Sequence, residues 1–275
     1  MDFLSAVLLG IVEGLTEFLP VSSTGHLTIT EKALNLRIDD PSVTAFTAVI
    51  QIGAIAAVIV YFRTDIWRIA KAWALGLFRP ELRGEFDHRM GWYIIVGSVP
   101  IGVVGFLGKD VITGPLRNLW WVAGALIVWS AVLVLAERRA TQDRGERQLT
   151  LSDALIIGSA QCIALVPGVS RSGATISAGL FRGLDRVTAT RMSFFLSIPA
   201  LVAAGLYELK DAVNSDIGLG ETAVATLVSF VVAYAAVAWL LRFVAHHTMV
   251  VFAVYRVSLG LVLVALLATG VISAT

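Results

Sequence analysis

Long apolar stretches separated by short polar segments dominate the pattern along this chain. Six of them have the roughly 20 mostly apolar residues that a helix needs to cross a bilayer. They cover residues 41–62, 89–108, 118–136, 189–207, 222–243 and 249–271. The pattern predicts an all-α polytopic membrane protein, in which residues 1–275 form a single integral membrane domain with six transmembrane helices.

Two further apolar stretches are too short to cross comfortably and end at a proline. Residues 1–20 stop at Pro20, and residues 151–166 stop at Pro167. A second short helical stretch follows each proline-bearing loop. We expect two re-entrant helical hairpins, because such broken helices are tolerated at membrane depth only when protein or a wet cavity surrounds them. The predicted hairpins comprise residues 1–35 and 151–183.

The two hairpins open two halves of the same plan. Three predicted spans follow each hairpin, and a charged run at 137–150 connects the halves. Because three is an odd number, the second half must start on the opposite side of the membrane. We therefore predict an inverted-topology repeat, with residues 1–138 as the first unit and 150–275 as the second. Residues 63–80 have an amphipathic pattern, which is typical of a helix lying on the membrane surface.

The distribution of Lys and Arg predicts the orientation. One side receives fourteen basic residues, from the loop 63–89, the linker, the segment 182–191 and Arg242. The other side receives five, namely Lys32, Arg37, Lys109, Arg117 and Lys210. Because basic loops stay in the cytoplasm, both termini and the mouth of the first hairpin are predicted to face outside.

Composition agrees with this class and excludes several others. Hydrophobic residues make up 57% of the chain and charged residues 15%, whereas a soluble domain carries roughly 25% charged residues. The net charge of +1 provides no basic field for nucleic acid. A single cysteine, Cys162, excludes an intrachain disulfide and a cysteine-based metal cluster.

Two carboxylates mark the first hairpin. Glu13 and Glu17 are four residues apart and therefore share one helix face. Carboxylates at membrane depth are costly unless they are paired or coordinated. One interpretation is that they snorkel to water at the interface, and the other is that they form a cation site or an acid/base pair.

Polar residues begin the second helix of each hairpin. A helix N-terminus offers free N–H groups to a phosphate, although a Ser or Thr there is more often an ordinary N-cap. Arg171 lies among these residues and has the shape for bidentate phosphate contact, unless it forms a structural bridge to Glu13 or Glu17. Arg256, inside the last span, is a second anion contact, or it snorkels to the interface or bridges between helices. The candidate phosphate-binding residues are Ser22, Ser23, Thr24, Gly25 and His26 in the first half, and Ser170, Arg171, Ser172, Gly173 and Thr175 in the second.

These residues carry a resemblance to a known family. The stretch from Glu13 through Glu17 and Pro20 to His26, together with the stretch from Pro167 to Thr175, resembles the bacterial undecaprenyl-diphosphate phosphatase family, also called the bacitracin-resistance proteins. The resemblance extends over the whole chain, including the Tyr255–Arg256 pair. It implies hydrolysis of undecaprenyl diphosphate to undecaprenyl phosphate and inorganic phosphate, which recycles the lipid carrier for peptidoglycan synthesis.

The resemblance also implies further properties. A divalent cation, Mg or Ca, would be required, and the site of a multi-pass protein of the bacterial inner membrane would open to the extracytoplasmic side. By matching positions, the family's functional residues fall on Glu13, Glu17, Ser23, His26 and Arg171, with Glu13 and Glu17 as the metal ligands. The expected partners are a polyprenyl diphosphate lipid and the bilayer, with a homodimer as a candidate assembly and no nucleic acid.

The residues leave the nucleophile open. Ser23 is preferred, because a hydroxyl at the helix N-terminus lies closest to a bound phosphoryl group, with His26 or a glutamate carrying the proton. Direct attack by His26, or by an activated water, is the alternative. An inverted-repeat transporter or flippase of lipid phosphates is the rival function, since the same charges would bind a substrate without breaking a bond.

Overall fold

The computed structural model describes residues 1–37, 40–108, 118–212 and 218–274, and every regular element within these ranges is helical. The first half contains α1 (Phe3–Thr16), α2 (Ser23–Ala33), α3 (Pro41–Tyr61), α4 (Arg63–Phe78), η1 (Pro80–Leu82), α5 (Phe86–Leu107) and α7 (Leu119–Arg139). The second half contains η3 (Glu146–Gln148), α8 (Leu151–Ala160), η4 (Gln161–Leu165), α9 (Arg171–Phe181), α10 (Arg186–Ala212), α11 (Leu219–Val244) and α12 (Val250–Ala268).

Six helices of the described chain are long and apolar enough to cross a membrane. They are Ser42–Tyr61, Phe86–Leu107, Leu119–Arg139, Arg186–Leu206, Leu219–Val244 and Val250–Ala268. Each coincides with a span predicted from the sequence, with ends shifted by a few residues, so the prediction of an all-α fold with six helices of spanning length is confirmed. Phe3–Thr16 and Leu151–Leu165 are apolar but shorter.

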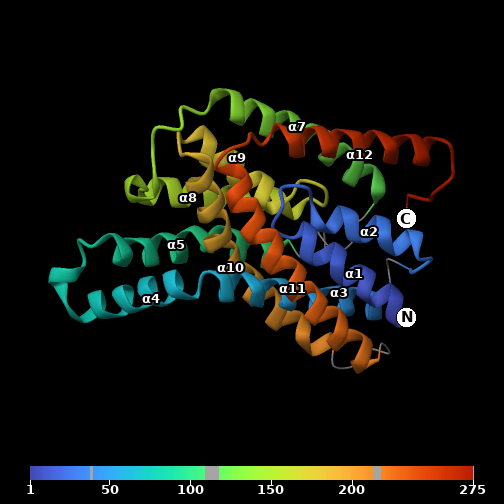
Figure 1. Cartoon of the computed structure of the whole chain (residues 1–275), viewed down its shortest axis with the longest axis horizontal. Coiled ribbons are helices and arrows are strands. Elements are labelled where there is room, and N and C mark those ends of the chain that lie inside the picture. The colour runs from blue at the N-terminus through green and yellow to red at the C-terminus, as the bar shows by residue number, and fades with distance from the viewer. Residues whose placement is uncertain (38–39, 109–117, 213–217, 275) are drawn as a thin grey trace.

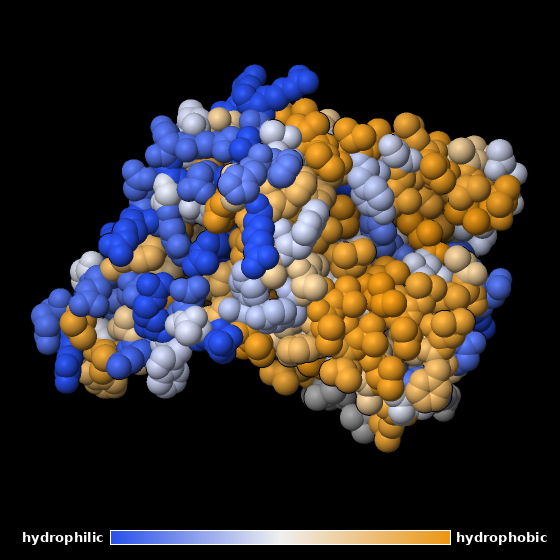
Figure 2. Space-filling model, in the orientation of Figure 1, coloured by the Kyte–Doolittle hydropathy of each residue, from blue (hydrophilic) through white to orange (hydrophobic). Residues whose placement is uncertain are grey.

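The helices run mostly along the long axis of the molecule (Figure 1). Both termini lie towards one end of this axis, and the connection from α7 to α8 lies towards the other. Hydrophilic side chains gather at the end with that connection, and hydrophobic ones cover much of the remaining visible face (Figure 2). Of the residues counted for orientation, Lys109 and Arg117 lie outside the described residues, as does the side chain of Lys210.

Close contacts of small residues attach the short helices to the spans. Gly10 of α1 faces α11, where a Cβ atom would come within 2.5 Å of the Ala225 carbonyl oxygen. Gly158 of α8 faces α5, where a Cβ atom would overlap the Gly97 carbonyl. Small residues let helix backbones approach this closely in a membrane protein. Each half thus presses its first short helix against the second span of the other half.

The predicted surface helix packs more closely on the bundle than the sequence indicated. Residues 63–80 were expected to lie along the membrane, and α4 covers most of them. α4 runs beside the first part of α5 (Figure 1), where Trp73 meets the ring of Trp92 edge-on at 5.6 Å. Apolar packing against α5 therefore covers one face of this amphipathic helix.

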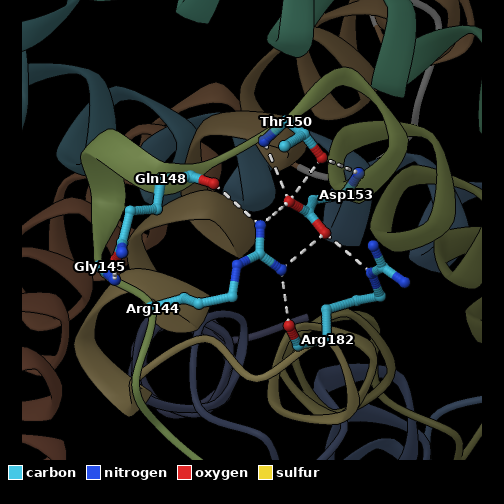
Figure 3. A network of polar contacts seen from close by, with 6 residues as sticks. All are labelled: Arg144, Gly145, Gln148, Thr150, Asp153 and Arg182. Atoms are coloured by element: carbon cyan, nitrogen blue, oxygen red, sulfur yellow. Dashed lines mark hydrogen bonds and ion pairs between the residues drawn. The ribbon is translucent and has the colours of Figure 1, made fainter.

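A buried carboxylate fastens the second short-helix pair to the preceding linker. Asp153, near the start of α8, has a fully buried side chain and accepts hydrogen bonds from Arg144, Arg182 and Thr150 (Figure 3). Arg144 also donates to the carbonyl oxygens of Gln148 and Arg182. The beginning of α8, the end of α9 and the linker are thereby held together, which fixes the position of the C-terminal end of α9.

Candidate active site

The second short helix of each pair begins at a serine with an unusual backbone. Ser22, before α2, has φ 78°, and Ser170, before α9, has φ 73°. Non-glycine residues rarely adopt this left-handed region, and such strain persists only where the surroundings determine it. Each serine hydroxyl accepts a hydrogen bond from the N–H three residues on, at Gly25 and Gly173. The N-cap interpretation of both serines is confirmed, and the two turns share one geometry.

Arg256 ties the two turns to each other. Its side chain is fully buried, and its two terminal nitrogens donate to the carbonyl oxygens of Pro20, at 3.1 Å, and Gly168, at 3.0 Å. Its Nε donates to the hydroxyl of Ser130 on α7, at 3.1 Å. The Ser172 hydroxyl adds a second tie by donating to the carbonyl oxygen of Leu19. These contacts favour the bridging interpretation of Arg256 over that of an anion contact.

The two turns bring a serine, a carboxylate and an arginine together. The Ser23 hydroxyl donates to Oε2 of Glu17 at 2.6 Å, and Arg171 donates from Nη2 to Oε1 of the same carboxylate at 3.0 Å. Glu17 and Arg171 are 5% and 12% exposed in their side chains. Nε and Nη1 of Arg171 have no hydrogen-bond partner within the described residues. The arginine therefore keeps donors available for a second anion while it holds Glu17.

Glu13 lies one helical turn before Glu17 in a different state. It is 1% exposed, and neither of its carboxylate oxygens has a hydrogen-bond partner among the described residues. Such a carboxylate needs a cation or a proton, because an unpaired charge at this depth is costly. No group of three or more His, Cys, Asp or Glu side chains in the described chain is arranged to hold a metal ion. The donor set suits an ion such as Mg²⁺, which takes only one or two protein carboxylates and completes its shell with water and phosphate oxygens.

His26 has two hydrogen-bond partners, and neither is the Ser23 hydroxyl. Its Nδ1 lies 2.7 Å from the carbonyl oxygen of Ser22, and its Nε2 lies 2.6 Å from the hydroxyl of Tyr255 on α12. Both ring nitrogens are thus engaged. Ser23 has its hydrogen bond to Glu17 instead, so the carboxylate, and not the imidazole, is placed to take the serine proton.

Other predicted residues are placed around the site in supporting positions. The Thr175 hydroxyl is buried and lies 2.9 Å from the carbonyl oxygen of Arg171 and 2.7 Å from the Ser193 hydroxyl, and the Ser170 and Ser172 hydroxyls lie 3.1 Å apart. Thr24 and Ser23 line the cavity described next. Whether Ser22, Thr24, Gly25, Ser170, Ser172, Gly173 and Thr175 bind substrate stays a prediction.

A cavity of about 210 Å³ leads to Glu13 and Ser23. Polar residues of α2 and α3 form much of its wall, and besides Ser23, Thr24 is the one among them that the motifs indicated. The signal for those of α3 was a polar stripe at intervals of three and four along an apolar span. The polar wall residues are Thr24, Thr28 and Glu31 of α2 with Thr44, Thr47 and Gln51 of α3.

Gln161 is a second buried polar residue without a side-chain partner in the described chain. It is fully buried at the start of η4, and both atoms of its amide lack a partner within the described residues. It occupies the position in the second half that Glu13 occupies in the first.

These features define a multi-pass membrane protein with a buried site of serine, carboxylates and arginine. The family model for bacitracin resistance protein BacA matches residues 6–262. The chain therefore belongs to this family, as its motifs predicted.

Three curated relatives show how close the similarity is. The chain is 56% identical to Undecaprenyl-diphosphatase 3 of Frankia casuarinae and 56% identical to Undecaprenyl-diphosphatase of Acidothermus cellulolyticus. It is 53% identical to Undecaprenyl-diphosphatase of Mycolicibacterium smegmatis. In each comparison the match covers 100% of this chain and 100% of the relative.

Proposed function

We propose that this protein hydrolyses undecaprenyl diphosphate to undecaprenyl phosphate and inorganic phosphate. The observation that carries the proposal is the Ser23–Glu17–Arg171 constellation, in which one carboxylate accepts from both a serine hydroxyl and a guanidinium. The full-length relatives named for this activity support the same substrate. Release of the lipid monophosphate recycles the carrier for peptidoglycan synthesis, and the family name connects such proteins with bacitracin resistance.

The site residues support covalent attack by Ser23. Glu17 takes the hydroxyl proton while the serine oxygen bonds to the terminal phosphorus and the bond to the bridging oxygen breaks. Undecaprenyl phosphate leaves, and water then attacks the phosphoserine to give inorganic phosphate and restore Ser23. Arg171 donates to the phosphoryl oxygens, where negative charge must be stabilised. His26 is less suited to attack, because Tyr255 occupies its Nε2.

We also propose that a divalent cation, Mg or Ca, assists the reaction. Glu13 would hold it, since its carboxylate is buried without a partner in the described chain, and Glu17 would supply a second ligand. Bound there, the cation would neutralise charge on the diphosphate. Glu13 would hold the cation close to Ser23, and Glu17 would keep its contact with the serine hydroxyl.

The membrane arrangement proposed for this site is a pair of re-entrant hairpins within an inverted repeat. The matching serine turns, and the matching contacts of α1 with α11 and of α8 with α5, support a repeat of residues 1–138 and 150–275. The Lys and Arg counts support an inner-membrane protein whose cavity opens to the extracytoplasmic side. A reporter fused after the last residue should therefore show an extracytoplasmic C-terminus, and a cytoplasmic signal would invert this orientation.

Phosphate release by the purified protein in detergent tests the activity. With undecaprenyl diphosphate and Mg²⁺ we expect stoichiometric inorganic phosphate, and chelation of the cation should stop it. A protein that bound the lipid but released no phosphate would be the flippase or transporter instead. Light scattering on the same sample distinguishes a monomer from a homodimer.

A further inference from the structure

Tyr255 makes a direct contact with the candidate active site. Its hydroxyl lies 2.6 Å from Nε2 of His26, and the two rings are stacked with centroids 5.6 Å apart and planes 11° from parallel. The residues come from α12 and α2 and are separated by 229 positions in the chain. Tyr255 is 46% exposed, so its hydroxyl reaches inward from the surface of the protein.

The two partners of His26 determine where its proton lies. The carbonyl oxygen of Ser22 can only accept, so Nδ1, at 2.7 Å from it, carries the hydrogen. In the neutral ring Nε2 is then the bare nitrogen, and the Tyr255 hydroxyl donates to it. The Ser22 carbonyl oxygen thus sets the tautomer, and the tyrosine hydroxyl fixes the orientation of the imidazole.

The imidazole in turn supports the strained turn before Ser23. Ser22 has φ 78°, and its carbonyl oxygen accepts from both the backbone N–H of His26, at 3.2 Å, and Nδ1. In the second half Ala174 stands at the position of His26, so the Ser170 turn has no such support from a ring. The chain of contacts from Tyr255 through His26 to the Ser22 carbonyl oxygen is therefore present at the turn that presents Ser23 to Glu17 and has no counterpart at the Ser170 turn.

We propose that Tyr255 is a positioning residue for this hydrolysis: its hydroxyl holds the His26 ring in one orientation, and His26 holds the Ser22 turn so that Ser23 stays aimed at Glu17. The proposal rests on the proposed phosphatase function, but its geometric part does not depend on the substrate. In this arrangement His26 is neither nucleophile nor base, because Nδ1 is bonded to the Ser22 carbonyl oxygen and Nε2 to the Tyr255 hydroxyl.

Replacing Tyr255 with Phe keeps the stacked ring and removes only the hydroxyl. We expect kcat to fall about tenfold, the scale of one lost hydrogen bond, with KM within about twofold of the wild type. The matched control is Tyr234→Phe on α11. The Tyr234 ring is 39% exposed, contacts the Tyr61 ring edge-to-face and lies far in sequence from the site motifs. The kinetics of this control should match the wild type.

Nitrogen NMR of ¹⁵N-histidine protein tests the geometric part directly. The His26 signals, assigned from their loss in His26→Ala, should show one protonated Nδ1 and a hydrogen-bonded Nε2 in the wild type. In Tyr255→Phe the Nε2 signal should shift because its hydrogen-bond donor is gone, and the Nδ1 signal should show a weaker hydrogen bond to the Ser22 carbonyl oxygen. An unchanged His26 spectrum in Tyr255→Phe overturns the proposal, whether or not the protein releases phosphate.

A double-mutant cycle separates positioning through His26 from general packing. If Tyr255 acts through His26, adding Tyr255→Phe to His26→Ala should lower kcat no further. Full additivity of the two changes contradicts the proposal. Absence of phosphate release in the wild type would instead refute the phosphatase function and leave the NMR result to decide the role of Tyr255.

Discussion

Arg171 donates a hydrogen bond to Glu17, with 3.0 Å between Nη2 and Oε1, although the two residues are 154 positions apart in the chain. Each lies at the turn of a different short-helix pair. The contact therefore forms only when the two halves of the protein come together, and it places the arginine next to the Ser23 hydroxyl.

Arg171→Lys tests whether the guanidinium binds phosphate. Lysine keeps the charge but lacks the planar fork, so phosphate release should fall by about 10²-fold if two donors contact the phosphoryl group. The activity assay with undecaprenyl diphosphate measures this, and Arg138→Lys in the exposed end of α7 serves as the control. Near-normal turnover of the lysine variant would leave Arg171 only a structural bridge.

Ser23→Ala should abolish turnover while the lipid still binds. Binding depends on the charged head and the long tail more than on one hydroxyl, whereas covalent attack requires the Ser23 oxygen. Rapid quenching of the wild type with labelled substrate should trap a phosphoprotein that the variant lacks. Ser98→Ala, at a hydroxyl bonded to Ile94 O of α5, should behave as wild type. Near-normal turnover of Ser23→Ala would transfer the role of nucleophile to His26 or water.

Glu13→Gln keeps the shape of the side chain and removes its charge. Activity should fall strongly, and the Mg²⁺ concentration for half-maximal activity should rise, because the carboxylate is the proposed cation ligand. Electron paramagnetic resonance of Mn²⁺ measures the binding loss without turnover. Glu81→Gln in η1 is the control. If turnover and metal response both stayed unchanged, Glu13 would not bind the cation.

Asp153→Asn should destabilise the protein in a pH-dependent way. Burial alone raises the pKa of this carboxyl, but hydrogen bonds from Arg144, Arg182 and Thr150 outweigh it and hold that pKa well below its usual value. A lowered folded-state pKa stabilises the protein above the unfolded value of about 3.9, and the effect is lost as the pH falls towards the folded-state pKa.

Unfolding measured in detergent across pH checks this expectation. At pH 6 the variant should lose about 2 kcal/mol, less than for a fully enclosed pair because solvent partly screens Arg182. Below about pH 4 the difference from the wild type should shrink, since protonation weakens the same contacts in the wild type. A deficit that stayed constant down to pH 3 would mean that the carboxylate charge contributes little.

Much of the architecture followed from the sequence because a bilayer imposes strong local rules. A helix must be about 20 apolar residues long to cross, and the six spans satisfied that rule over continuous stretches. The breaks at Pro20 and Pro167 were equally local, since proline and glycine interrupt helices wherever they occur. The residue types at the helix starts were sufficient to indicate phosphate chemistry and the family.

Only the tertiary structure decided how the charged groups are paired. The sequence left Arg171 a choice of Glu13 or Glu17, and folding gave it Glu17 and left Glu13 without a partner in the described chain. It likewise did not decide whether Arg256 contacts an anion or forms a bridge. The hydrogen bonds of Arg256 to the carbonyl oxygens of Pro20 and Gly168 favour the bridge. Hydrophobicity and helix signals are read over neighbouring positions, whereas these contacts join residues 88 to 236 positions apart. Their geometry depends on how the two halves pack, and no local pattern encodes it.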